Sequence, residues 1–274
     1  MRKKIQTVFL NVPVILISIT SIFPIFWMMY NSLKSESEFV MDKLALPNKI
    51  NFENYVEAIR IGKMQNYFIN SFFNSMVTVI AVILFSFFIA YFISRYEFKG
   101  KRIIYYLFLF GMLVPVHSLL IPIFIQFSRL GLINNRFTLL FPYVAFGMPL
   151  AIFLFDSFIK TVPIEVEEAA IIDGCGTFSR IMRIVFPLCL PVVSSVVVLS
   201  FLGAWNEFPF ALTLLTSSEF KTIPIGLANF SGQYSTQYTP LMAGLVIATL
   251  PVIIIYIIFN KQIVKGMTAG AVKG

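Results

Sequence analysis

Long apolar stretches dominate this sequence and restrict the folds that it can adopt. A helix needs roughly 20 apolar residues to cross the hydrocarbon core of a bilayer, and six stretches of the chain reach that length. Only 12% of the 274 residues are charged, whereas about a quarter of the residues in a soluble domain are charged. We therefore predict one all-α membrane domain, 1–274, and not a soluble helical bundle. Its six transmembrane helices are expected at about 8–30, 68–93, 103–125, 138–159, 188–215 and 239–260.

The distribution of lysine and arginine predicts how these spans are oriented. Of the 21 Lys and Arg residues, 13 lie at the two termini and in the second and fourth connections, and eight lie in the other connections. Cytoplasmic segments of membrane proteins are enriched in these residues. Both termini and the 161–187 loop are therefore predicted to be cytoplasmic, and the 34–66 loop is predicted to be extracytoplasmic.

The first apolar stretch has a second interpretation. Its basic start, Met1-Arg2-Lys3-Lys4, also suits a secretory signal peptide. The stretch continues to Tyr30 without a small-residue cleavage site, so we expect a retained first helix.

The net charge and the cysteines exclude several functions. The formal charge is +8, but the basic residues lie between apolar stretches, a placement that suits lipid headgroups better than nucleic acid. The two cysteines, Cys175 and Cys189, show no metal-ligand spacing. We expect a partner bilayer, no nucleic acid, no disulfide, no metal and no cofactor.

The connection between the fourth and fifth spans carries the clearest helix signals. Thr161 can cap a helix, Pro163 suits a first turn, and Gly174 can end the helix. Glutamates near its start oppose the positive end of the helix dipole. We predict a short helix over 163–174, followed by a second one that Thr177 can cap.

This loop also carries a family resemblance. Glu168-Ala169-Ala170, followed by Gly174, Ile184 and Pro187, resembles the EAA loop of binding-protein-dependent ABC importer permeases. The resemblance implies the type I permease fold, in which this loop is a coupling helix that docks in a cleft of the ATP-binding subunit. Cys175 stands where an alanine is commoner in that family. The positions that the resemblance assigns to ATPase coupling are Glu168, Ala169, Ala170, Asp173, Gly174, Ile184 and Pro187.

The resemblance extends over nearly the whole chain. These matches look like the carbohydrate permeases related to maltose transport, and six spans with such a tail look like the smaller of their two permease subunits. The resemblance implies a bacterial cytoplasmic membrane, an ATP-binding subunit dimer, a second permease subunit, an extracytoplasmic solute-binding protein and a sugar. The matching segments are Asn70-Ser71, Pro115, Ile121-Pro122, Gly131 to Asn135, Trp205-Asn206-Glu207-Phe208 and Gly266 to Gly274.

The sequence lacks a phosphate-binding loop. Gly62-Lys63 and Gly100-Lys101 have neither the upstream glycine nor the following Ser or Thr of the GxxxxGK[ST] motif. We therefore expect that the chain is not an enzyme and that partner subunits hydrolyse ATP.

A few polar residues inside the predicted spans are candidates for a substrate path or a gate. Polar groups at that depth are expected to face protein or water. His117 can line a sugar path or bond between helices, and Trp205, Asn206 and Glu207 can face sugar or serve packing. Asn70, Ser71, Asn74 and Ser75 recur at helical spacing, and we expect them to join helices.

Three other functions remain open from the residues. A proton- or sodium-coupled transporter would show internal repeats and paired intramembrane carboxylates. An intramembrane protease would need a catalytic set within the spans. An ABC importer could also carry peptides, amino acids or osmolytes in place of sugar.

Overall fold

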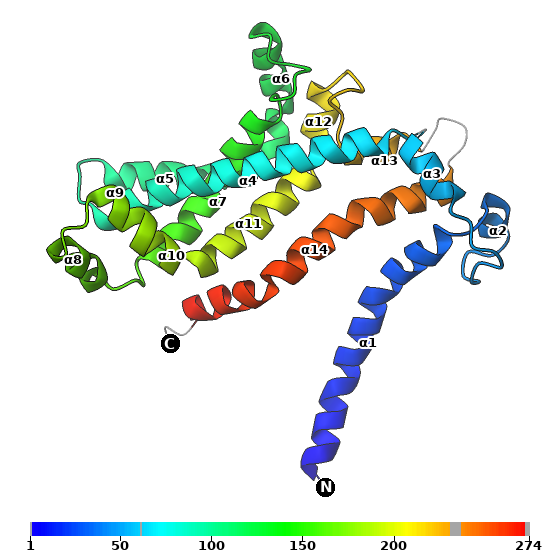
Figure 1. Ribbon diagram of the computed structural model, residues 1–274, viewed down its shortest axis with the longest axis horizontal. Coiled ribbons are helices and arrows are strands. Elements are labelled where there is room, and N and C mark those ends of the chain that lie inside the picture. Colours follow the sequence, from blue (N-terminus) through cyan, green and yellow to red (C-terminus); the bar gives the residue numbers. More distant parts are fainter. Residues whose placement is uncertain (1, 61, 231–236, 272–274) are drawn as a thin grey trace. The chain divides into compact units, whose positions relative to one another are not determined.

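The computed structural model of the chain is helical, with no strand in the residues that it describes (Figure 1). These are residues 2–60, 62–230 and 237–271, with side chains described for 11–60, 62–230 and 237–260. The chain divides into two compact units. Unit 1 is Met1–Gln65 with Gly226–Pro251, and unit 2 is Asn66–Ile225 with Val252–Gly274.

Unit 1 contains α1 (Arg2–Asn31), α2 (Glu36–Met41), α3 (Glu53–Arg60) and the start of α14 (Tyr238–Ala271). The predicted 34–66 loop thus contains two short helices. The carboxylate of Glu36 accepts hydrogen bonds from the backbone N–H groups of Tyr238 and Thr239, at 3.2 and 3.0 Å. The Asn54 amide donates to the carbonyls of Ser32 and Lys34, both at 2.7 Å. These contacts hold the segment after α1 against the start of α14.

Unit 2 is built around three long helices, α4, α7 and α11, whose facing sides form a shared apolar core (Figure 1). Phe87 of α4, Phe155 of α7 and Val196 of α11 are among its buried side chains. Its helices are α4 (Met64–Arg95), α5 (Lys101–Gly111), the 3₁₀ turn η1 (Val116–Leu119), α6 (Leu120–Arg129), α7 (Leu140–Ile159), α8 (Ile164–Ile172), α9 (Thr177–Arg180), the π-helical turn η2 (Ile181–Val185), α10 (Phe186–Leu188), α11 (Leu190–Trp205), α12 (Pro209–Leu214) and α13 (Ile223–Ala228), the last of which continues into unit 1.

Within the described residues, four helices are long and apolar enough to cross a membrane: Asn11–Asn31, Met64–Arg95, Leu140–Ile159 and Tyr238–Asn260. They match the first, second, fourth and sixth predicted spans. Two bent helix pairs raise the number of candidate spans to six if each pair counts as one span.

The third and fifth spans are not the single helices that the sequence predicted. In place of a helix over 103–125, Lys101–Gly111 and Val116–Arg129 meet at 91°. Pro115 lies at the break with an extended ψ of 99°. Proline cannot donate to the helix ladder, which favours a break at this position. In place of a helix over 188–215, α11 covers only Leu190–Trp205. It meets the preceding segment, Thr177–Leu188, at an angle of 77°.

Candidate functional site

The helix predicted over 163–174 is present as α8, Ile164–Ile172, but its start differs from the prediction. Pro163 occupies the N-cap position, without a side-chain hydrogen bond. Thr161 does not cap α8, because it lies in the turn just after α7 and its hydroxyl donates back to the Phe158 carbonyl at 2.7 Å. The second helix also starts without the predicted cap, since Gly176 and not Thr177 precedes it.

The end of α8 agrees with the role expected of Gly174. Gly174 has a φ of +79°, in the left-handed region that glycine adopts without strain. Its N–H donates to the Ile171 carbonyl at 3.0 Å, and the N–H of Cys175 donates to the Ala170 carbonyl at 2.9 Å. This pair of bonds is a Schellman motif, which ends the helix and satisfies its last carbonyls.

The predicted ATPase-coupling residues divide between an outer and an inner face of the 161–187 segment. Ala170 is buried, Ile184 is half-buried in η2, and the other five are exposed. Large apolar side chains lie beside the exposed ones, with Ile172 86% exposed and Phe178 70% exposed. The exposed predicted residues are Glu168, Ala169, Asp173, Gly174 and Pro187.

The inner face of α8 is held by a residue that the sequence pattern did not single out. Glu167 is 3% exposed and accepts hydrogen bonds from Tyr91 Oη at 2.6 Å and Arg95 Nε at 2.7 Å. From the sequence, Glu167 was one of several glutamates near a helix start. The signal that could have marked it is its three-residue spacing from the small Ala170, which puts both on one helical face.

The Trp205-Asn206-Glu207 group does not form a single polar surface. Trp205 is buried and stacks on Phe201, with ring centroids 5.3 Å apart. Asn206 is exposed, and its amide donates to the Leu202 carbonyl at 3.1 Å. The three consecutive side chains therefore have three different environments.

Glu207 is fixed by contacts with two helices. Its carboxylate accepts from Tyr143 Oη of α7 at 2.7 Å and from the N–H groups of Phe210 and Ala211 at 2.7 and 3.1 Å. The last two are free donors in the first turn of α12. This geometry favours a packing role for Glu207 at the turn between α11 and α12.

His117 and the polar residues of α4 are not arranged as the lining of a single substrate path. His117 lies in η1 with an exposed side chain. Asn70 Nδ2 donates to the carbonyls of Glu219 and Lys221 at 2.6 and 3.0 Å, and Ser71 Oγ accepts from the N–H of Ile223 at 2.9 Å. These two α4 residues thus hold a loop and the start of α13, where we expected contacts between spans.

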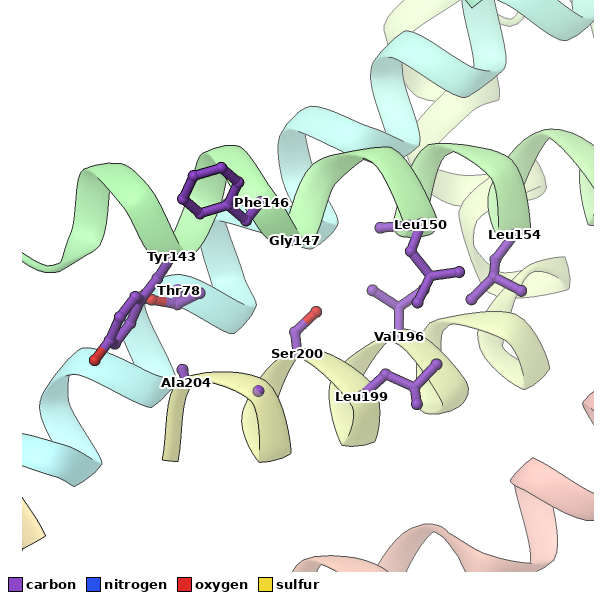
Figure 2. A pocket seen from close by; sticks show the side chains of 12 residues that line it. Thr78, Tyr143, Phe146, Gly147, Leu150, Leu154, Val196, Leu199, Ser200 and Ala204 are labelled. Atoms are coloured by element: carbon purple, nitrogen blue, oxygen red, sulfur yellow. The ribbon is translucent and has the colours of Figure 1, made fainter. Parts of the chain in front are cut away.

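A cavity of about 220 Å³ lies between α4, α7 and α11 (Figure 2). Its lining is mainly aliphatic, and Figure 2 shows the Ser200 hydroxyl pointing from α11 toward α7. Thr78 Oγ1 is buried at its edge with no hydrogen-bond partner among the described residues. Tyr143, which binds Glu207, forms another part of the wall.

The comparisons with known proteins agree on one family. Residues 82–269 match the family model described as the binding-protein-dependent transport system inner membrane component. The diacetylchitobiose uptake permease NgcG of Streptomyces coelicolor is 34% identical, over 93% of this chain and 85% of that protein. The arabinooligosaccharide permease AraQ of Bacillus subtilis is 35% identical, over 94% and 93%. The trehalose/maltose permease MalG of Thermococcus litoralis is 34% identical over the whole of both chains.

A solved structure confirms the fold. A chain of a bacterial ABC transporter that imports the acidic polysaccharide alginate superposes with a TM-score of 0.84 and 22% identity, covering 96% of this chain and 98% of that one. The all-helical ABC importer permease fold is therefore confirmed. If each bent pair counts as one span, the described residues give the predicted number of six candidate spans.

A family model that covers most of the chain and relatives that match it nearly end to end lead to one conclusion. The chain belongs to the family of binding-protein-dependent transport system inner membrane components, as a multi-pass permease.

Proposed function

We propose that this chain is a permease subunit of an ATP-driven, binding-protein-dependent sugar importer, in which it forms half of the translocation path. In this proposal α8 docks on the ATPase and couples its closure to the membrane helices. The observation that carries the proposal is the two-sided character of α8. Glu167 and Ala170 are buried against the rest of the chain, while Ile172 on the opposite face of the helix is 86% exposed.

The exposed apolar side chains of α8 support docking on another protein. The helix lies between the candidate spans α7 and α11, and not within one. Apolar groups outside the bilayer favour a partner that covers them. The small, exposed residues Ala169 and Gly174 lie close to Ile172 in the sequence and let a partner's surface approach the backbone closely.

The names of the relatives support a sugar as cargo. The three permeases described above are named for diacetylchitobiose, arabinooligosaccharides and trehalose or maltose. All of these are carbohydrates of two or more units. We propose cargo of that class, and transport of a peptide, an amino acid or an osmolyte would contradict this part of the proposal.

The proposed complex contains an ATP-binding subunit dimer, a second permease subunit and an extracytoplasmic solute-binding protein. In this arrangement the termini and the 161–187 segment face the cytoplasm, and 34–66, with α2 and α3, faces outward. The excess of Lys and Arg in the inward set supports this orientation. We place the complex in a bacterial cytoplasmic membrane.

Transport in this proposal is mechanical. Closure of the ATPase dimer displaces α8, and the displacement switches the path between outward and inward access. The chain supplies no catalytic residue. We assign exposed Asn206 and His117 to the path or its gate, and Trp205 and Glu207 to packing at the turn between α11 and α12.

The test of docking is the variant Gly174→Leu with Gly131→Leu as its matched control. Both glycines have positive φ, +79° and +66°, and a Cβ at either would meet no atom of the chain within 4 Å. The backbone penalty is therefore similar, roughly 1 to 2 kcal/mol. Only Gly174 lies in the proposed interface, where overpacking costs roughly 1 to 3 kcal/mol more. Each loss of about 1.4 kcal/mol lowers the affinity for the ATPase about tenfold.

The measurement is the amount of co-expressed ATPase that purifies with each variant, together with membrane insertion. We expect normal insertion of both variants and loss of the ATPase with Gly174→Leu alone. Normal association of the ATPase with Gly174→Leu would show that α8 is not the docking element. Uptake from a panel of trehalose, maltose, diacetylchitobiose and an arabinooligosaccharide tests the cargo class.

A further inference from the structure

We infer that Glu167 is a positioning residue that joins α8 to the end of α4, so that movement of α8 passes directly into that span. This inference rests on the proposed docking of α8. It adds the contact through which docking would act on the membrane helices.

The joint attaches one carboxylate at two points. Glu167 Oε2 accepts from Tyr91 Oη at 2.6 Å, and Oε1 accepts from Arg95 Nε at 2.7 Å. Tyr91 and Arg95 are four residues apart and therefore lie on the same face of α4. Because each oxygen has its own donor, both the position and the rotation of the carboxylate are fixed.

Arg95 also holds the segment that leads into α8. Its Nη2 donates to the Val162 carbonyl at 2.7 Å, just before α8 begins. The rigid, planar guanidinium can direct several donors at once. One side chain at the last residue of α4 thus fixes both α8 and its linker.

Among the described residues, few other contacts orient α8. Of its nine residues, only Glu167 and Ala170 are buried. Helices shorter than about 12 residues are marginal on their own, and the alanine contributes a single methyl group. A buried ion pair is weak evidence for added stability, but it can specify one arrangement of the groups around it. The orientation of the docking face therefore depends mainly on Glu167.

Arg180 brings a third segment to the same carboxylate. Its Nε lies 3.4 Å from Glu167 Oε2, close enough for an ion pair but without a hydrogen bond. Its Nη2 lies 3.3 Å from Tyr96 Oη, beyond the end of α4. Arg180 ends α9, where the bent pair that leads into α11 begins. The ends of α4 and α9 thus meet on the carboxylate of Glu167 in α8.

The first test is Glu167→Gln, with Glu97→Gln as control. Glu97 lies two residues beyond α4, and its side chain is 90% exposed in an ion pair with Lys101, so its variant removes the same charge outside the joint. We expect both variants to keep the ATPase bound, since the outer face of α8 is unchanged. Allosteric couplings are typically at least fivefold, so in Glu167→Gln stimulation of ATP hydrolysis by sugar-loaded binding protein should fall by roughly that factor.

Tyr91→Phe is the second variant. It removes one donor to Glu167 while it keeps the buried ring, so the complex should assemble even if Glu167→Gln does not. We expect a smaller loss of stimulation in the same direction. Normal stimulation in Tyr91→Phe, together with failed insertion of Glu167→Gln, would mean that the joint serves folding alone and would overturn the inference.

A distance measurement shows whether Glu167 passes the movement of α8 to α4 or only stabilises the folded chain. Spin labels at exposed positions 97 and 165, in a Cys175→Ala background, report the distance between the end of α4 and α8. We expect one narrow distance in the assembled complex, unchanged by ATP, and a broader distance that changes with ATP in Glu167→Gln. Unchanged distances with normal stimulation would overturn the inference while the proposed docking stands. Lost ATPase association in Glu167→Gln would also overturn it, whereas failure of the docking proposal is read from Gly174→Leu.

Discussion

Two short helices of unit 2, α8 and α12, are each held by a glutamate, yet they relate to the core in different ways. α8 projects past the end of the unit where α10 lies, and α12 follows the other end of α11 (Figure 1). Glu207 precedes α12 and binds its first N–H groups. Glu167 lies inside α8 and pairs with an arginine of another helix.

The difference in burial shows which helix is available to a partner. Half of the six residues of α12 are buried, namely Phe210, Ala211 and Leu214, in a cluster with Leu139 and Tyr143. Only two of the nine residues of α8 are buried. α12 is therefore part of an apolar core cluster, whereas α8 is held by polar contacts that leave its exposed apolar side chains free to be covered.

The largest effect that this comparison predicts is on the stability of the region around α12. Phe210 is 1% exposed, and truncating a buried phenylalanine to alanine typically costs about 3 to 5 kcal/mol. We expect Phe210→Ala to lower the thermal unfolding temperature of the purified complex strongly. Ile172→Ala on α8 should leave that temperature unchanged and weaken ATPase association instead. Similar destabilisation by both variants would remove the distinction between the two helices.

A smaller effect is expected from Glu207→Gln. Hydrogen bonds to a charged group contribute about 1.5 to 3 kcal/mol, and the amide keeps the shape of the side chain while it weakens three of them. We expect a moderate loss of stability and of complex yield, with transport falling in the same proportion. Transport and yield should be measured together. A loss of transport at full yield would assign Glu207 to the path or its gate.

The smallest effect is expected at Glu97, an exposed glutamate that supports neither helix. A hydrogen bond from Lys101 lowers the pKa of Glu97. Any stabilisation by this pair is therefore present above the pKa of the unfolded chain and is lost as the pH falls through the lower folded pKa. Exposed pairs contribute little, so Glu97→Gln should unfold at the wild-type temperature between pH 7 and pH 5. A clear difference there would mean that charge at the end of α4 matters outside the Glu167 joint.

The sequence predicted the parts of the fold that depend on long apolar patterns and on turn chemistry. The spans that became α1, α4, α7 and α14 were found because their apolar stretches continue without interruption. The end of α8 at Gly174 was found because a left-handed helix end favours glycine. Both signals are local in the chain.

The features that the sequence did not predict depend on contacts between distant residues or on the direction of the chain. The 91° bend near Pro115 lies within an apolar stretch. An apolar pattern predicts that a segment is buried or in lipid, but not in which direction its helix axis runs. Thr161 had a capping residue type, but its hydroxyl donates back to the Phe158 carbonyl of α7. The pairing of Glu167 with Arg95 joins residues 72 positions apart, so neither neighbourhood marks it.

The claim that α8 is the docking helix is tested most directly by crosslinking from its outer face. A photo-reactive residue at position 172, where the native side chain is 86% exposed, is compared with one at Phe85, which is 57% exposed on the span α4. The account predicts a crosslink from position 172 to the ATP-binding subunit in the assembled complex, and none to that subunit from position 85. Labelling of position 172 by an impermeant external reagent, with no crosslink to the ATPase, would contradict it.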